Sequence, residues 1–126
     1  YDWTTFRRLL REGNHDSVLI GWSADNGDPD NFYRPLLSCD AIPSGTNRAR
    51  WCEPAYDEIL DKALQTEDIE VRKALYLQAN QLIFEKLPLV PIAHAYRYQA
   101  YRKELNGMII NPFGGVRLGG VTKPRD

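Results

Sequence analysis

The chain has 126 residues, of which 43% are hydrophobic and 26% charged, and its formal net charge is −1 at pH 7. This length and composition are sufficient for one domain with a hydrophobic core. A charge so close to zero gives no reason to expect nucleic acid as a partner, and the longest apolar runs are far too short for a transmembrane segment.

The first part of the chain predicts a helix followed by a buried strand. Apolar residues recur at helical spacing from Trp3 to Leu10, with Asp2 or Thr4 as a suitable cap and Gly13 as the stop. The next apolar run, residues 17–22, is short and contains β-branched side chains, which is typical of a strand.

An acid-rich loop, residues 23–30, follows this strand. Its aspartates, Asp25, Asp28 and Asp30, are typical of residues that cap helices and satisfy the loop backbone. Alternatively, an aspartate just past the strand end, beside the indole of Trp22, receives a cation such as an amine, because a partly desolvated carboxylate attracts an ammonium group strongly. The residues by themselves leave both interpretations open.

Three further helices are predicted. Asp28 or Asp30 caps the first, which extends to about Leu37. Pro54 suits the first turn of the second helix, and Asp68 or Thr66 starts a longer third helix that ends before Pro88. The last two helices carry apolar stripes that are expected to pack against a sheet. The stripes consist of Tyr56, Ile59, Leu60, Ala63 and Leu64 in one helix, and of Val71, Leu75, Ala79, Leu82 and Ile83 in the other.

The segment 87–103 is predicted to begin as extended chain, because Pro88 and Pro91 bar a helix there. Its later part alternates tyrosines with basic residues, as in proteins that bind single-stranded nucleic acid, but the composition lacks the wider basic surface that such binding requires. Residues 107–112 are predicted to form a last strand. The glycines after it do not form a phosphate loop, because the lysine and the serine or threonine of that motif are missing.

The sequence contains no evident catalytic or metal-binding constellation. Ser38, His94 and an aspartate supply the residue types of a hydrolase triad, but no G-x-S-x-G elbow surrounds the serine. Zinc sites need closely spaced ligands, and His15 and His94 lie far in sequence from both cysteines. We therefore expect no enzyme activity, no metal and no cofactor.

Three stretches of the chain resemble a known family. GWSADNGDPDNFYRPLLSC, TNRARWCEPAYDEILDKAL and LPLVPIAHAYRYQAYRKELNGMIINPFG are similar to the C-terminal third of the peptide-binding subunits of bacterial ABC importers, and most similar to the Sap-type members linked to antimicrobial peptide resistance. The resemblance implies an α/β fold, part of a two-lobed periplasmic binding protein of type II, with a mixed sheet flanked by helices. Residues 1–95 would form the C-terminal part of the second lobe, and residues 96–126 the crossover and return to the first lobe.

The resemblance also implies roles for individual residues. In the dipeptide-binding relatives, the aspartate of the G-W-x-x-D segment receives the α-amino group of the bound peptide, and this aspartate is Asp25, with Trp22 beside it. The basic residue that binds the peptide carboxylate lies in a part of the family's sequence that this chain does not contain. A disulfide in the same relatives implies a bridge between Cys39 and Cys52.

The composition is consistent with that bridge. Cys39 and Cys52 are the only cysteines, and the segment between them contains Pro43, Ser44 and Gly45, which let its ends approach. Closing such a loop would contribute roughly 3 kcal/mol to stability in the chain-entropy model. Free or metal-bound thiols are the alternatives, and a disulfide would indicate an oxidising compartment.

The function implied by the resemblance is capture of a peptide in a cleft between the lobes, followed by delivery to the membrane subunits of an ABC transporter. The implied location is the bacterial periplasm. Tyr1 is not preceded by a basic and apolar leader, so the signal peptide for export is expected outside this fragment. Two alternatives stay open: the same fold binding haem or another non-peptide cargo, and an interaction surface that needs no small ligand.

Overall fold

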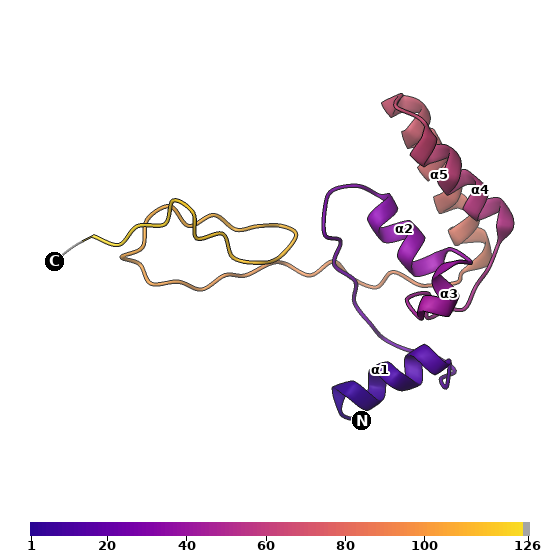
Figure 1. Ribbon diagram of the computed structural model, residues 1–126, viewed down its shortest axis with the longest axis horizontal. Helices are drawn as coiled ribbons and strands as arrows, with labels where there is room; N and C mark the ends of the chain where they lie inside the picture. The colour runs from indigo at the N-terminus through magenta and orange to yellow at the C-terminus, as the bar shows by residue number, and fades with distance from the viewer. Residues whose placement is uncertain (125–126) are drawn as a thin grey trace.

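The computed structural model describes residues 1–124, and residues 125 and 126 lie outside the described part. Figure 1 shows the helices gathered at one end of the molecule and a long C-terminal segment that runs away from them. The helices are α1 (Trp3–Glu12), α2 (Asp30–Leu37), α3 (Ala41–Ser44), α4 (Pro54–Gln65) and α5 (Ile69–Lys86).

The ends of α1 and α5 are set by the residues that the sequence indicates. The Asp2 carboxylate accepts the backbone N–H groups of Thr4 and Thr5, both at 3.0 Å, and Gly13 ends α1 with a left-handed φ of 77°. In α5, the Asp68 carboxylate accepts the backbone N–H groups of Glu70 and Val71. Each cap satisfies backbone groups that the helix itself leaves without partners.

The hydrophobic core lies where α2, α4 and α5 meet. α4 and α5 pack along each other, and α2 lies across α4. Tyr56 and Leu60 of α4 are completely buried, and the Tyr56 hydroxyl donates to the Tyr33 carbonyl at 3.2 Å. The buried core residues are Leu37, Tyr56, Leu60, Ala63, Tyr76, Ala79 and Ile83.

The prediction that the two apolar stripes pack against a sheet is wrong for the described part of the chain. The helices use these stripes to pack against each other, and α5 adds Tyr76 to the contact. Because α5 carries apolar residues on more than one face, Leu77 and Phe84 are left 61% and 80% exposed. Val71, which the pattern placed on the packed face, is 49% exposed.

The two predicted strands do not form within residues 1–124. Residues 17–22 belong to no ladder, and the region of residues 107–112 makes only isolated bridges, Asn106 with Thr122 and Ile110 with Val116. A strand needs a neighbouring strand to satisfy its backbone N–H and C=O groups, and within residues 1–124 neither segment extends its contacts beyond isolated bridges into a continuous ladder. The expected mixed sheet is therefore not confirmed.

The C-terminal segment does avoid helix, as its prolines predict. The chain leaves α5 at Leu87, whose φ of 50° ends the helix, and it continues without regular secondary structure. No helix within residues 1–124 has both the length and the apolar character needed to cross a bilayer.

Candidate functional site

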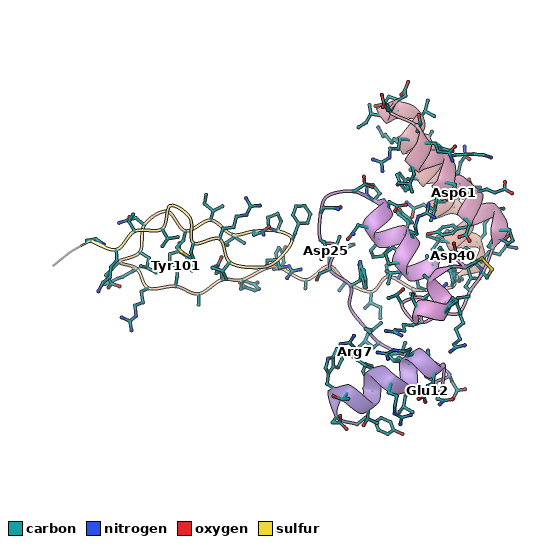
Figure 2. The ribbon with its side chains drawn as sticks, viewed as in Figure 1. Arg7, Glu12, Asp25, Asp40, Asp61 and Tyr101 are labelled. Carbon is teal, nitrogen blue, oxygen red and sulfur yellow. A yellow bond between two sulfur atoms is a disulfide. The ribbon has the colours of Figure 1, made fainter. Side chains whose placement is uncertain are left out.

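The loop between residues 21 and 31 contains the two residues predicted to bind ligand, Trp22 and Asp25. Figure 2 shows Asp25 between the helical part of the molecule and the extended C-terminal segment. Both side chains are exposed, that of Trp22 to 40%. The structure therefore places both side chains on one loop that is accessible to a ligand.

Trp22 is attached to α2 through a backbone group that a proline leaves free. Pro35 lies inside α2 and has no N–H to donate to the carbonyl of Asn31, four residues earlier. The indole Nε1 of Trp22 donates to this carbonyl at 3.0 Å. Since the polar edge of the indole is used in this way, Trp22 offers a ligand apolar ring surface rather than a hydrogen-bond donor.

Asn31 also holds Asp25. Its side-chain oxygen accepts the backbone N–H of Asp25 at 2.7 Å. Sequence reasoning did not single out Asn31, although an asparagine four residues before an intrahelical proline is a usable signal, because its carbonyl needs another donor. The backbone at Asp25 is thus fixed, and within residues 1–124 its carboxylate makes no hydrogen bond or ion pair.

The other two aspartates of the loop are occupied. Asp28 accepts Arg72 Nη2 with both carboxylate oxygens at 2.7 Å, and it also accepts the Asp30 backbone N–H at 2.9 Å. Asp30 pairs with Arg34 at 3.3 Å. The prediction that Asp28 or Asp30 caps α2 is wrong in detail, because Pro29 occupies the N-cap position and has no side-chain acceptor, while Asp28 accepts the N–H of the first helical residue from one position earlier. Of the three loop aspartates, only Asp25 has an unpaired carboxylate.

Arg72 connects the loop to the core of the protein. Its Nε donates to the Ala63 carbonyl at 3.0 Å, Nη2 donates to the Tyr76 hydroxyl at 3.2 Å, and the guanidinium lies 5.4 Å from the centre of the Tyr76 ring. Burial raises the pKa of Asp28, but the hydrogen bonds from Arg72 and the Asp30 amide outweigh it and hold this pKa below its ordinary value. Sequence reasoning missed Arg72, since nothing in a helical pattern links it to a carboxylate 44 residues away.

The C-terminal segment contacts the same loop from the other direction. Arg97 Nη2 donates to the Ser23 hydroxyl at 2.7 Å. A Cβ placed on Gly27 would lie 3.4 Å from the ring of Phe113, so this part of the segment also passes close to the loop. The loop that carries Asp25 is therefore held on one side by α2 and α5 and touched on another by the segment after residue 87.

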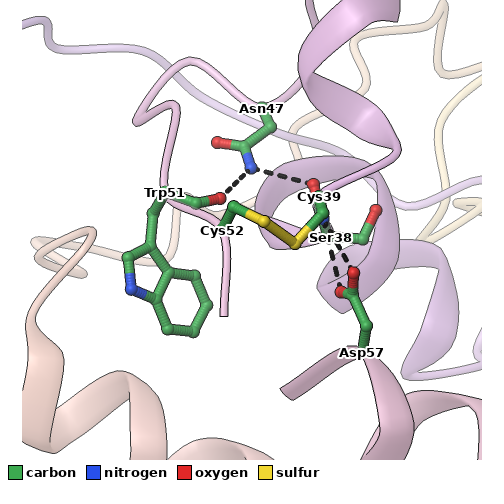
Figure 3. Close-up of a disulfide and its surroundings, with 6 residues drawn as sticks. All are labelled: Ser38, Cys39, Asn47, Trp51, Cys52 and Asp57. Atoms are coloured by element: carbon green, nitrogen blue, oxygen red, sulfur yellow. Dashed lines mark hydrogen bonds between the residues drawn. A yellow bond between two sulfur atoms is a disulfide. The ribbon is translucent and has the colours of Figure 1, made fainter. Parts of the chain in front are cut away.

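The predicted disulfide is confirmed. Cys39 and Cys52 are bridged, with their Cα atoms 4.5 Å apart (Figure 3). Asn47, buried within the bridged loop, donates to the carbonyls of Ser38 at 3.0 Å and Trp51 at 2.7 Å. Asp57 of α4 accepts the Cys39 backbone N–H at 3.1 Å, so the bridge is tied to the helical core.

The residues that were considered for catalysis or metal binding do not form a site. Ser38, which precedes Cys39 in the chain, is only 2% exposed, whereas His94 is exposed in the C-terminal segment. Within residues 1–124, no three histidine, cysteine, aspartate or glutamate side chains are grouped so that they could hold a metal ion.

Comparisons with known proteins identify close relatives. The chain is 43% identical over 116 residues to the peptide transport periplasmic protein SapA of Salmonella typhimurium, covering 92% of this chain and 21% of SapA. It is 40% identical over 122 residues to a dipeptide-binding protein of Pseudomonas aeruginosa, covering 97% of this chain and 23% of that protein. No protein-family model matches the chain.

Solved structures give the same result. The crystal structure of a dipeptide-binding protein from Pseudoalteromonas sp. SM9913 in complex with Met-Leu has a TM-score of 0.88 and 49% identity, covering 98% of this chain and 24% of that one. A DppA protein from Helicobacter pylori in complex with the peptide STSA has a TM-score of 0.65 and 35% identity, covering 70% of this chain and 18% of that one.

These comparisons confirm the family resemblance that the sequence indicates. They give no support to haem as a cargo. The chain spans about a fifth to a quarter of the length of the relatives that it matches.

Proposed function

We propose that this chain, which is homologous to a portion of the periplasmic peptide-binding proteins of ABC importers, holds the amino end of a bound peptide through Asp25. The observation that carries the proposal is the state of the three loop aspartates: Asp28 and Asp30 are paired with arginines, whereas Asp25 has a fixed backbone and an unpaired carboxylate. Peptides are bound in two of the solved relatives.

The chemistry of Asp25 suits a peptide ammonium group. Two unit charges about 4 Å apart attract by about 1 kcal/mol in bulk water and by about 4 kcal/mol at the effective dielectric constant of a protein surface. An exposed carboxylate therefore gains most when the cleft closes over the ligand and excludes water. Asp25 is exposed in this chain, so a ligand can reach its carboxylate.

Trp22 would form an apolar wall beside the ammonium group. Its Nε1 is used by Asn31, so the rest of the ring can cover the peptide backbone without leaving a polar atom unpaired. Because Asn31 also holds the Asp25 backbone, one residue sets the positions of both ligand-binding side chains.

The remaining features of the proposal follow from the family. Residues 1–95 would belong to the second lobe of a two-lobed protein, and residues 96–126, of which 125 and 126 lie outside the described part, would return to the first lobe. A peptide would bind between the lobes in the periplasm, hinge closure would bury it, and the membrane subunits of the transporter would accept the closed form. The relatives are solute-binding transport proteins, so we propose binding without catalysis.

The test is calorimetric titration with a short peptide in its free and N-acetylated forms, in a protein long enough to contain both lobes. We expect tight binding of the free form only. Asp25→Asn should weaken that binding by about 2 kcal/mol or more, or about thirtyfold, because the ammonium group would lose its charged partner in a closed cleft.

Asp40→Asn provides the matched control, because Asp40 is also an exposed aspartate but lies at the start of α3. Its peptide affinity should stay unchanged. Equal binding of the free and acetylated peptides would remove Asp25 from the site and keep a peptide cleft, whereas no binding of either would contradict peptide capture itself.

A further inference from the structure

A group of arginines lies where α1 meets the loop closed by the disulfide. Arg7 and Arg11 come from α1, and Arg48 and Arg50 come from the segment between the two cysteines. Figure 2 shows Arg7 on the side of α1 that faces the rest of the helices. Within residues 1–124, none of the four has a carboxylate within salt-bridge distance.

Contacts around Gly45 show that the aliphatic part of the Arg11 side chain and the guanidinium of Arg48 lie near the same point. A Cβ added to Gly45 would collide with the side chain of Arg11 and would lie 3.1 Å from Arg48 Nη1. Arg11 and Arg48 therefore occupy the same small area above Gly45. Gly45 has a left-handed φ of 71°, which also favours glycine at this position.

Arg48 carries the strongest sign of a missing partner. Its Nη1 is buried and has no hydrogen-bond partner in the described structure. Burial, followed by the charges of Arg11 and Arg7, lowers the pKa of Arg48. A buried guanidinium N–H without an acceptor is costly, and like charges around it add to that cost.

The nearby groups do not relieve this excess of positive charge. Glu12 of α1 accepts Arg8 with both carboxylate oxygens at 2.8 Å and also accepts Asn14 at 3.0 Å. Arg50 donates to the Arg11 carbonyl at 2.9 Å, which holds the two segments together but does not neutralise either cation.

We propose that Arg7, Arg11 and Arg48 form a binding site for a phosphate group. An oxyanion would offer an acceptor to the unpaired Arg48 Nη1 and neutralise the excess positive charge around it. A phosphate fits better than a single carboxylate, because it carries about two charges and offers oxygens in several directions, whereas a carboxylate is satisfied by one arginine fork. The site differs from the Asp25 loop in both its residues and the charge of its ligand.

The phosphate group has two sources, a small soluble anion or a lipid headgroup, and the experiment separates them. Pyrophosphate is titrated calorimetrically into the 126-residue chain at low salt, and flotation with vesicles that contain phosphatidylglycerol is measured in parallel. We expect saturable binding in at least one arm, and Arg48→Gln should weaken it about tenfold or more, because a bonded, partly buried charge is lost.

Arg7→Gln and Arg8→Gln form the matched pair that tests the geometry. Both arginines are exposed on α1, but Arg8 already pairs with Glu12. Arg7→Gln should weaken binding and Arg8→Gln should not. Because both side chains are exposed, both variants should fold like the wild type. Loss of binding in only the first variant supports the site, with the responding arm naming the source. Equal loss in both variants would show general charge attraction and overturn the proposal, as would the absence of binding in both arms.

Discussion

The helices from Asp30 to Lys86 and the segment after residue 87 contain similar apolar side chains, but they differ in how far these side chains are buried. The helices bury Leu37, Tyr56 and Leu60 completely, whereas Ile92 and Tyr98 in the segment are 76% and 89% exposed. A helix forms its backbone hydrogen bonds within its own segment, so it can pack against other helices without a further partner. An extended chain needs a neighbouring strand to form its backbone hydrogen bonds. Within residues 1–124, the helices therefore bury their apolar side chains and the segment does not, because it has no continuous ladder to pack with.

Truncation of the central core residue should produce the largest change. Leu60→Ala should lower the free energy of unfolding by about 2–5 kcal/mol, because Leu60 is completely buried between α4 and α5 and its loss leaves a cavity. Urea unfolding followed by circular dichroism measures this. Leu64→Ala is the control in the same helix, since Leu64 is 52% exposed and should change stability far less. Equal effects of the two variants would mean that the α4–α5 core is not formed as described.

The same contrast explains what the sequence could and could not predict. The N-terminal ends of α1, α4 and α5 were predictable, because Asp2, Pro54 and Asp68 act within the first turn of their own helices. The strands were not, because an apolar run with β-branched residues shows the preference for a strand and does not show whether a neighbour is present.

In the candidate site, too, some residues were predictable from the sequence and some contacts were not. The family resemblance indicated Asp25 and Trp22, and composition and resemblance together indicated the bridge between Cys39 and Cys52. The contacts that select Asp25 from the three aspartates depend on Arg72, which lies 44 residues from Asp28. Such a pairing arises from the packing of α5 beside the loop, and no local pattern encodes it.

Removal of the disulfide should have the next largest effect and should be confined to the helices. The double variant Cys39→Ser, Cys52→Ser should lose roughly 3 kcal/mol of stability, because the loop is no longer closed in the unfolded chain. Urea unfolding of the oxidised and reduced wild-type chain gives an independent value without a mutation. Digestion of the exposed segment after residue 87 should proceed at the same rate in both states, and a faster rate on reduction would contradict the separation of the two regions.

The ion pair of Asp28 with Arg72 should have a smaller, pH-dependent effect. The pKa of Asp28 is lowered in the folded protein, so its stabilising contribution is present above its ordinary value of 3.8 and is lost as the pH falls through the lower folded value. Asp28→Asn should cost about 1 kcal/mol at neutral pH, since both side chains are partly exposed, and the difference from wild type should disappear in acid. Thermal unfolding across this pH range tests the sign.

Asp25→Asn is the control for that experiment, because the Asp25 carboxylate makes no ion pair within residues 1–124. Its stability should match that of the wild type at neutral pH. Asp57 works in the opposite direction: burial is the main cause of its raised pKa, so its protonation stabilises the folded state in acid. Because this contribution is common to both proteins, the difference between wild type and Asp28→Asn isolates Asp28, and a difference that grows in acid would contradict the ion pair.

The smallest effect is expected in the exposed segment, and it tests the comparison most directly. Ile92→Ala should change the stability of the 126-residue chain by less than about 0.5 kcal/mol, because the side chain is 76% exposed. In a longer protein that supplies the neighbouring strands, the same substitution should cost about 1 kcal/mol or more, as expected for a side chain that becomes buried. Urea unfolding of both pairs of proteins measures the two values. If Ile92→Ala is silent in both, Ile92 stays exposed in the longer protein as well, and missing neighbours do not explain why this part of the segment differs from the helices.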